Sequence, residues 1–219
     1  LRAIAGTLRP MAGTVRLNGR DVKTCSHRSL ARKIAFLPQS PTAPGDYTIK
    51  DLVSYGRFPH LNWTGSMTRK DWDIVNDALE RTHLTSLATR YISTLSGGER
   101  QRAWIAMALA QQPEVLILDE PTTYLDISFQ FEVLELIRAL NASLNITILM
   151  VIHDLNQAAR FSRRIIALNQ GRVVVDGPPE KLLQPKMIED IFHISVGIES
   201  DPYNNCPYVI PIQSRRIGK

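Results

Sequence analysis

The chain has 219 residues, 44% of them hydrophobic and 21% charged, which is typical of a globular protein with an apolar core. The formal net charge of +5 comes from scattered basic residues, so composition does not indicate a nucleic-acid binder. Cys25 and Cys206 lack the spacing of a metal site and are expected as reduced thiols. No apolar run approaches the roughly 20 residues of a membrane span.

The first third of the chain predicts short elements. Apolar residues at helical spacing over positions 1–8 predict the end of a helix. Alternating apolar and polar residues around Asn18-Gly19 predict a β-hairpin over 14–22. The apolar run 34–37 predicts a short buried strand, which Pro38 ends, and a loop rich in proline and glycine follows Gln39.

The middle of the chain is predicted to be helical. Helical patterns over 49–55, 71–81 and 100–111 predict an α-helical lobe inserted into an α/β core. Ser96 stands three residues before Glu99, which predicts a capping box at the start of the last helix. Gly97 and Gly98 cost stability in a first turn, so the pair indicates that something approaches this backbone closely. A helix N-terminus also offers free N–H groups to an anion.

Strands and helices alternate from residue 115 onward. Runs 115–118 and 146–152 predict strands buried on both faces, and helices are predicted over 127–140 and 155–161. A hairpin over 165–176 and a helix over 180–192 with a break at Pro185 follow, and the tail beyond 198 reads as loop. This alternation predicts an α/β fold with a mostly parallel, doubly covered sheet.

Polar side chains follow three of the predicted strands. Gln39 follows the first strand, Asp119 and Glu120 follow the second, and His153 follows the third. Parallel strands would bring these residues to one edge of the sheet, where ligands of α/β proteins bind. There Asp119 would hold a hard cation such as Mg²⁺, and Glu120 would act as general base. Each residue alone also fits an ordinary turn or a polar strand end.

In their order and spacing, these residues resemble the motifs of ATP-binding cassette (ABC) ATPases, over residues 1 to about 176. Gln39 is similar to the Q-loop, 95–99 to the signature motif, 115–120 to Walker B with its catalytic glutamate, 124–126 to the D-loop, and His153 to the switch histidine. The resemblance implies a P-loop NTPase-like fold, with ATP and Mg²⁺ as cofactors. It implies catalytic roles for Glu120, His153 and Gln39, with Mg²⁺ held by Asp119 and Gln39, partly through water.

The same resemblance implies a homodimer with shared nucleotide sites. Ser96, Gly97, Gly98 and Glu99 of one subunit would contact ATP held by the other, and Asp126 would lie at the dimer contact. One cassette would cover residues 1–219, with an α/β core at 1–46 and 112–176, a helical subdomain at 47–111 and a C-terminal extension at 177–219.

Segments 56–60, 120–127 and 207–211 are similar to the branch of this family that imports iron–siderophore complexes, haem and cobalamin. This narrower resemblance implies the ATP-hydrolysing subunit of a bacterial importer on the cytoplasmic face of the plasma membrane. Its partners would be two permease subunits and, indirectly, a substrate-binding protein, and it would bind no nucleic acid. Among the possible cargoes, a ferric siderophore is the first choice. The alternatives are a soluble ABC ATPase without a transport role and a non-catalytic truncated cassette.

The sequence contains no G-x-x-x-x-G-K-[ST] phosphate-binding loop, the Walker A motif. We therefore expect this loop, and part of an N-terminal antiparallel β portion, to precede Leu1 in the complete protein. We also expect the polypeptide as printed to bind and hydrolyse little ATP.

Overall fold

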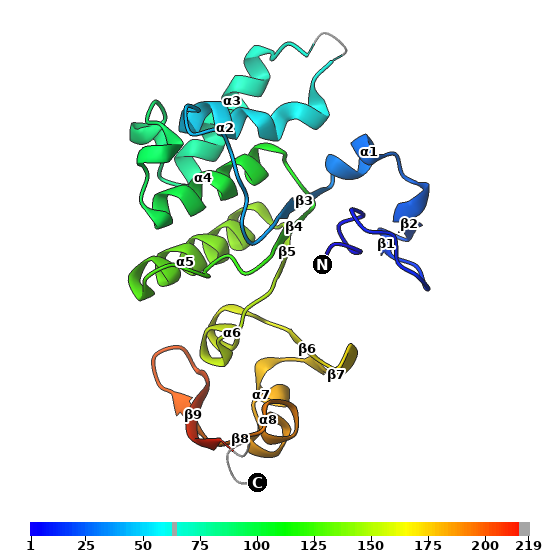
Figure 1. The fold of residues 1–219 in the computed structure, drawn as a ribbon, viewed down its shortest axis with the longest axis vertical. Helices are drawn as coiled ribbons and strands as arrows, with labels where there is room; N and C mark the ends of the chain where they lie inside the picture. The colour runs from blue at the N-terminus through cyan, green and yellow to red at the C-terminus, as the bar shows by residue number, and fades with distance from the viewer. Residues whose placement is uncertain (63–64, 215–219) are drawn as a thin grey trace. The chain divides into compact units, whose positions relative to one another are not determined.

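The computed structural model describes residues 1–62 and 65–214 (Figure 1). The chain forms two compact units, Leu1–Val151 and Ile152–Lys219, and each is described by itself below. The predicted helical subdomain, 47–111, lies within the first unit. The second unit begins before residue 177, where the sequence places the start of a C-terminal extension, and the predicted domain division stays a prediction.

A three-stranded parallel sheet lies in the first unit, in the order β3 (Ile34–Leu37), β4 (Val115–Leu118), β5 (Thr147–Met150). Alternate residues point to opposite faces, so Leu116 and Leu118 join one apolar cluster while Ile117 joins another. The central strand is buried on both faces, as predicted. The strand predicted over 146–152 forms as β5, over a shorter range, but its predicted burial on both faces is wrong, because it is only half-buried and pairs with one neighbour among the described strands.

Helices cover this sheet and form the predicted helical lobe. The elements are α2 (Ile49–Ser54), η2 (Tyr55–His60), α3 (Arg69–Arg81), η3 (Thr85–Leu87), η4 (Ile92–Thr94), α4 (Gly97–Ala110) and α5 (Ile127–Leu144). One apolar cluster includes Ile105 of α4, Leu118 of β4 and Val133 of α5, none of which has exposed surface. The lobe and the sheet therefore share a continuous core, which fixes α4 relative to the ends of the strands.

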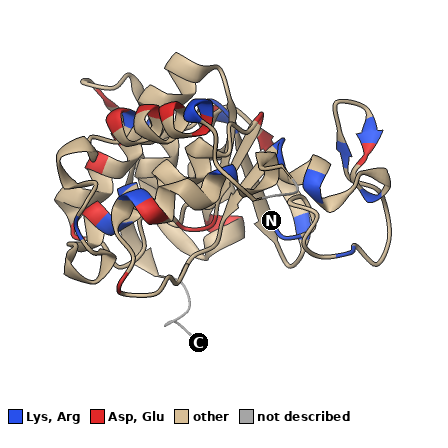
Figure 2. Ribbon diagram, turned by 90° about the horizontal axis from the view of Figure 1, so that it is seen from above, with Lys and Arg blue, Asp and Glu red and all other residues tan. Residues whose placement is uncertain are grey.

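The N-terminal part contains β1 (Arg16–Leu17), β2 (Arg20–Asp21), η1 (Val22–Thr24) and α1 (His27–Ala31). The predicted hairpin is confirmed, with Asn18 and Gly19 at φ 50° and 79° in its turn. The helix predicted over 1–8 is wrong: only a turn forms, and Gly6 ends it at φ 74°. Figure 2 shows Lys and Arg gathered over this part rather than scattered evenly.

The second unit comprises α6 (Leu155–Phe161), β6 (Ile165–Asn169), β7 (Arg172–Gly177), α7 (Pro179–Leu182), α8 (Pro185–Phe192), β8 (Ile194–Asp201) and β9 (Cys206–Ser214). The β6–β7 hairpin and the helix break before Pro185 are confirmed. The loop predicted beyond residue 198 is wrong, because β8 and β9 form a hairpin whose Val196 and Val209 are buried. No helix in the described ranges has the length and apolarity needed to cross a bilayer.

Candidate active site

Gln39 and Glu120 meet at the carboxyl ends of β3 and β4. Leu37 pairs with Leu118 in the parallel ladder, and the Asp119 N–H extends the pairing by donating to the Leu37 carbonyl at 2.9 Å. Two residues beyond the Leu37–Leu118 pair on each strand, the Gln39 side-chain Nε2 donates to Glu120 Oε2 at 2.6 Å. The expectation that these two strand ends share one edge is confirmed, while the catalytic roles of both residues stay predictions.

The backbone after β4 turns sharply at Glu120. Glu120 has φ 52° and Tyr124 has φ 67°, a left-handed conformation that is uncommon for residues other than glycine. Thr123 Oγ1 donates to Glu120 Oε2 at 2.9 Å, and the Thr123 N–H donates to the Glu120 carbonyl at 3.3 Å. Such strain often occurs at functional sites, where surrounding contacts hold it. Here the turn and the Thr123 hydroxyl hold the Glu120 carboxylate against Gln39.

Asp119 precedes this turn and offers a second carboxylate at the same sheet edge. The described residues contain no group of three or more His, Cys, Asp and Glu side chains able to hold a metal ion. Mg²⁺ does not need such a cage, because it binds proteins through one or two carboxylates and takes its other ligands from water and substrate phosphates. The oxygen donors of Asp119 and Gln39 therefore fit Mg²⁺ bound together with a nucleotide.

The signature segment begins α4 as predicted. Ser96 Oγ accepts a hydrogen bond from the Glu99 N–H at 3.2 Å, and Glu99 Oε2 accepts one from the Ser96 N–H at 2.8 Å. This reciprocal pair is the predicted capping box. The hydrogen bond from the Ser96 backbone is the main cause that lowers the pKa of Glu99. The carboxylate is therefore held at the helix N-terminus, where it also complements the helix dipole.

The two glycines of this segment pack against the chain's own side chains. A Cβ at Gly98 would lie 2.7 Å from Phe129 Cδ1, and a Cβ at Gly97 would lie 3.1 Å from Leu125 Cδ2. The predicted close approach is therefore present, and the groups that approach come from the turn before α5 and from α5 itself. Sequence reasoning missed Phe129, because no local pattern links it to a glycine 31 positions earlier.

The predicted D-loop joins β4 to α5. Asp126 is the N-cap residue of α5, and its side chain makes no capping hydrogen bond to that helix. Gln130 Nε2 donates to the Leu125 carbonyl at 2.8 Å and so holds the turn onto α5. Tyr124 and Ile127 on either side of Asp126 are 89% and 73% exposed. Two exposed apolar side chains in one turn suit a surface that a partner covers.

His153 belongs to the second unit, directly before α6. Its neighbour Asp154 caps that helix by accepting a hydrogen bond from the Gln157 N–H at 2.8 Å. The approach of His153 to Glu120 therefore stays a prediction.

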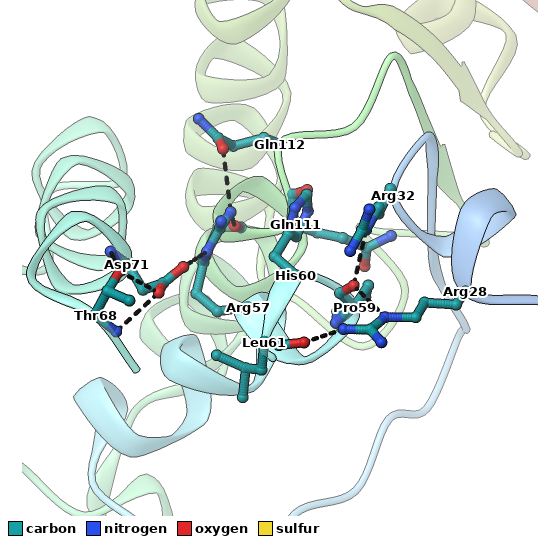
Figure 3. A network of polar contacts seen from close by, with 11 residues as sticks. Arg28, Arg32, Arg57, Pro59, His60, Leu61, Thr68, Asp71, Gln111 and Gln112 are labelled. Atoms are coloured by element: carbon teal, nitrogen blue, oxygen red, sulfur yellow. Dashed lines mark hydrogen bonds and ion pairs between the residues drawn. The ribbon is translucent and has the colours of Figure 1, made fainter. Parts of the chain in front are cut away.

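Residues 56–60 form a junction in the first unit around the buried Arg57 (Figure 3). The Arg57 side chain forms an ion pair with Asp71 at 3.0 Å and donates to the Ala110 carbonyl at 2.7 Å and to Gln112 Oε1 at 3.1 Å. Hydrogen bonds from Thr68 and then from Arg57 lower the pKa of Asp71 to about 2. Arg57 therefore joins the start of α3 to the end of α4.

The neighbours of Arg57 strengthen this junction. A Cβ at Gly56 would lie 2.1 Å from the Met107 carbonyl oxygen, so only glycine fits there. His60 Nε2 lies 2.8 Å from the Gln111 carbonyl, and burial lowers the pKa of this imidazole. Arg28 and Arg32 donate to the Pro59 carbonyl at 3.0 Å and 2.9 Å, which ties α1 to the same segment.

A parallel sheet with a paired glutamine and glutamate at its strand ends, beside a glycine-led capped helix, defines an α/β protein of the nucleotide-hydrolysing class. The family model for ABC transporters matches residues 1–123, and the chain belongs to the ABC transporter family. Membership of this family makes the chain an ATP-binding protein, while the roles of its strand-end carboxylates stay predictions.

Relatives and solved structures agree with this assignment. The iron(3+)-hydroxamate import ATP-binding protein FhuC of Bacillus subtilis (strain 168) is 47% identical, over 94% of this chain and 77% of that protein. The ferric enterobactin transport ATP-binding protein FepC of Escherichia coli (strain K12) is 41% identical, over 97% of this chain and 78% of that protein. The petrobactin import ATP-binding protein FpuD of Bacillus anthracis is 41% identical over the whole chain and 81% of that protein.

Among solved structures, an inward-facing metal-chelate type ABC transporter superposes with a TM-score of 0.76 at 30% identity, over 83% of this chain and 72% of that one. The ATP-binding cassette MJ0796, in a dimeric post-hydrolysis state with ADP and phosphate, superposes with a TM-score of 0.67 at 28% identity, over 81% of this chain and 78% of that one.

Proposed function

We propose that this protein is the ATP-hydrolysing subunit of a bacterial ABC importer for an iron complex. Among such complexes, a ferric siderophore is the cargo that we favour. The observation that carries the cargo class is the 47% identity to FhuC over 94% of the chain, because that protein's name assigns it to iron(3+)-hydroxamate import. FepC and FpuD, named for ferric enterobactin and petrobactin, support the same class at 41% identity.

Hydrolysis is assigned to the sheet edge where Gln39 meets Glu120. The Glu120 carboxylate accepts a proton from the water that attacks the γ-phosphate of ATP, as a general base. Gln39 and Thr123 both donate to Glu120 Oε2, which fixes the orientation of the carboxylate. Asp119 and the Gln39 amide oxygen would hold Mg²⁺, and the ion when bound neutralises phosphate charge.

The remaining motif residues serve a second copy of the subunit. Ser96, Gly97, Gly98 and Glu99 would contact ATP bound by the partner, with Asp126 and its exposed neighbours at the dimer contact. His153 would position the γ-phosphate. The dimeric form of MJ0796 supports this arrangement. The homodimer would dock on two permease subunits at the cytoplasmic face of the plasma membrane and would serve a substrate-binding protein indirectly.

The test of hydrolysis is Glu120→Gln in the intact transporter, with Glu114→Gln as matched control. Both glutamates flank β4, but Glu114 lies at the opposite end, in an exposed ion pair with Lys33 at 2.9 Å. Loss of a general base should lower the ATP turnover rate by roughly 100-fold or more, while ATP binding persists. The control should retain turnover within about twofold, as expected for an exposed ion pair. Turnover of the Glu120 variant within a few-fold of the unsubstituted protein would exclude the assigned role.

The cargo is tested in cells that lack the gene. Growth on a ferric hydroxamate as sole iron source should fail, should return with the unsubstituted gene, and should not return with Glu120→Gln. Normal uptake in the deletion strain, with a defect in translation or DNA repair instead, would point to a soluble ABC ATPase.

A further inference from the structure

Helices α4 and α5 pack side by side (Figure 1), and Phe129 of α5 lies against Gly98 of α4 at the seam between them. Gly98 is buried, so it has a neighbour before any nucleotide arrives. A Cβ at this glycine would meet three Phe129 atoms, with Cδ1 at 2.7 Å, Cγ at 3.0 Å and Cβ at 3.3 Å. Because Cγ and Cβ stand at the root of the side chain, rotation of the ring cannot remove the clash.

Gly97 provides the contrast within the same turn. Among the described residues, a Cβ at Gly97 would approach one side-chain atom, Leu125 Cδ2 at 3.1 Å, which is the far end of a flexible side chain. A methyl group at Gly97 therefore requires only the end of the Leu125 side chain to move, whereas a methyl group at Gly98 requires Phe129 to shift from its root. The packing requirement for glycine is stronger at 98 than at 97.

Further contacts fasten the same seam. Arg102, one turn after Gly98, forms an ion pair with Glu132, nearly one turn after Phe129, at 3.0 Å. On the α5 side of the seam, Gln130 Nε2 donates to the Leu125 carbonyl at 2.8 Å and holds the preceding turn onto that helix. The start of α4 and the turn that carries Asp126 are therefore parts of one packed body.

We propose that Phe129 is a positioning residue for ATP hydrolysis: by packing on Gly98 it sets where the signature backbone meets the partner's nucleotide. This inference rests on the proposed function, in which the signature segment contacts ATP in trans. It assigns the glycine at 98 to packing within the subunit as well as to access for the nucleotide.

The test is a double-substitution cycle in the intact transporter with Gly98→Ala, Phe129→Ala and the pair of both. Gly98→Ala should lower the ATPase kcat at least tenfold, with the KM for ATP changed less than threefold, because the γ-phosphate contact is displaced while the partner still binds ATP. Phe129→Ala should lower kcat about threefold. The kcat of the double variant should return to within about threefold of the kcat of Phe129→Ala. Gly97→Ala is the matched control, and its loss in kcat should be smaller than that of Gly98→Ala.

Thermal unfolding of the isolated subunit separates packing from catalysis. The unfolding midpoint of the pair should exceed the value expected from adding the two single losses. If neither the midpoint nor kcat is rescued, the packing argument is overturned. If the midpoint is rescued and kcat is not, the nucleotide alone requires the glycine, and the positioning role is overturned. Absence of ATP hydrolysis by the unsubstituted transporter would instead refute the proposed function, and the positioning role with it.

Discussion

Arg57→Met removes the charge at the centre of the buried junction but keeps an unbranched apolar stem. The Arg57 side chain is 5% exposed and that of Asp71 is 11% exposed, so the substitution leaves a buried carboxylate without its cation. It also removes the donor to the Ala110 carbonyl at the end of α4. Removing one partner of a buried ion pair typically costs about 3–5 kcal/mol, and we expect a loss in this range in the free energy of unfolding.

The lowered pKa of Asp71 points in the same direction. A pKa of about 2 in the folded protein, against an ordinary value near 4, corresponds to roughly 2 kcal/mol of stability at neutral pH. Thr68 is the main cause of this shift, so Arg57 contributes only part of it. The rest of the expected loss comes from the Ala110 and Gln112 oxygens that lose their donor, at about 1–3 kcal/mol for a buried group left unsatisfied.

Urea denaturation at pH 7, followed by the fluorescence of the buried Trp104 in α4, measures this loss. The matched control is Arg81→Met, because Arg81 also pairs with an aspartate, Asp77 at 2.7 Å, but with side chains 36% and 55% exposed. An exposed helix pair contributes about 0.5 kcal/mol, so the control should be almost neutral. If the two variants lost stability within 1 kcal/mol of each other, the junction would not be a buried electrostatic clamp.

Two further predictions follow from the described contacts. The pKa of Asp71 is lowered in the folded protein, so its contribution to stability is complete above about pH 5 and is lost as the pH falls toward 2. Acid unfolding, monitored by Trp104 fluorescence, should therefore be less steep in Asp71→Asn. An unchanged profile would mean that another carboxylate dominates acid unfolding. Thr123→Val removes a hydrogen-bond donor to Glu120 Oε2, so kcat should fall several-fold with little change in the KM for ATP. A rise in KM alone would place Thr123 in nucleotide binding instead.

The sequence predicted best those features that local pattern and parallel pairing determine. Gln39 and Glu120 follow short apolar strands. Because these strands are parallel and end at paired residues, the two side chains meet as expected. Ser96 and Glu99 are three residues apart, so their capping box was also readable. Parallel strands place their polar termini together, and capping acts within a single turn.

Other features depend on contacts that the linear pattern does not carry. The tail beyond 198 reads as loop, yet it forms β8 and β9, and β9 accommodates Pro207 and Pro211 because it belongs to a two-stranded sheet among the described residues. The contact between Gly98 and Phe129 joins helices distant in sequence, so glycine alone suggested a ligand. The left-handed backbone of Glu120 was equally hidden, because glutamate gives no signal for positive φ.

The length of α4 couples its carboxyl end to the signature segment at its start. It has 14 residues, so at 1.5 Å per residue it is about 21 Å long. Arg57 holds its carboxyl end through the Ala110 carbonyl, and Ser96 lies at the opposite end. A tilt of about 5° around the Arg57 end would carry Ser96 roughly 2 Å, more than a hydrogen bond can stretch. A small displacement of the helical lobe near α3 would thus produce a larger displacement of Ser96 at the start of α4.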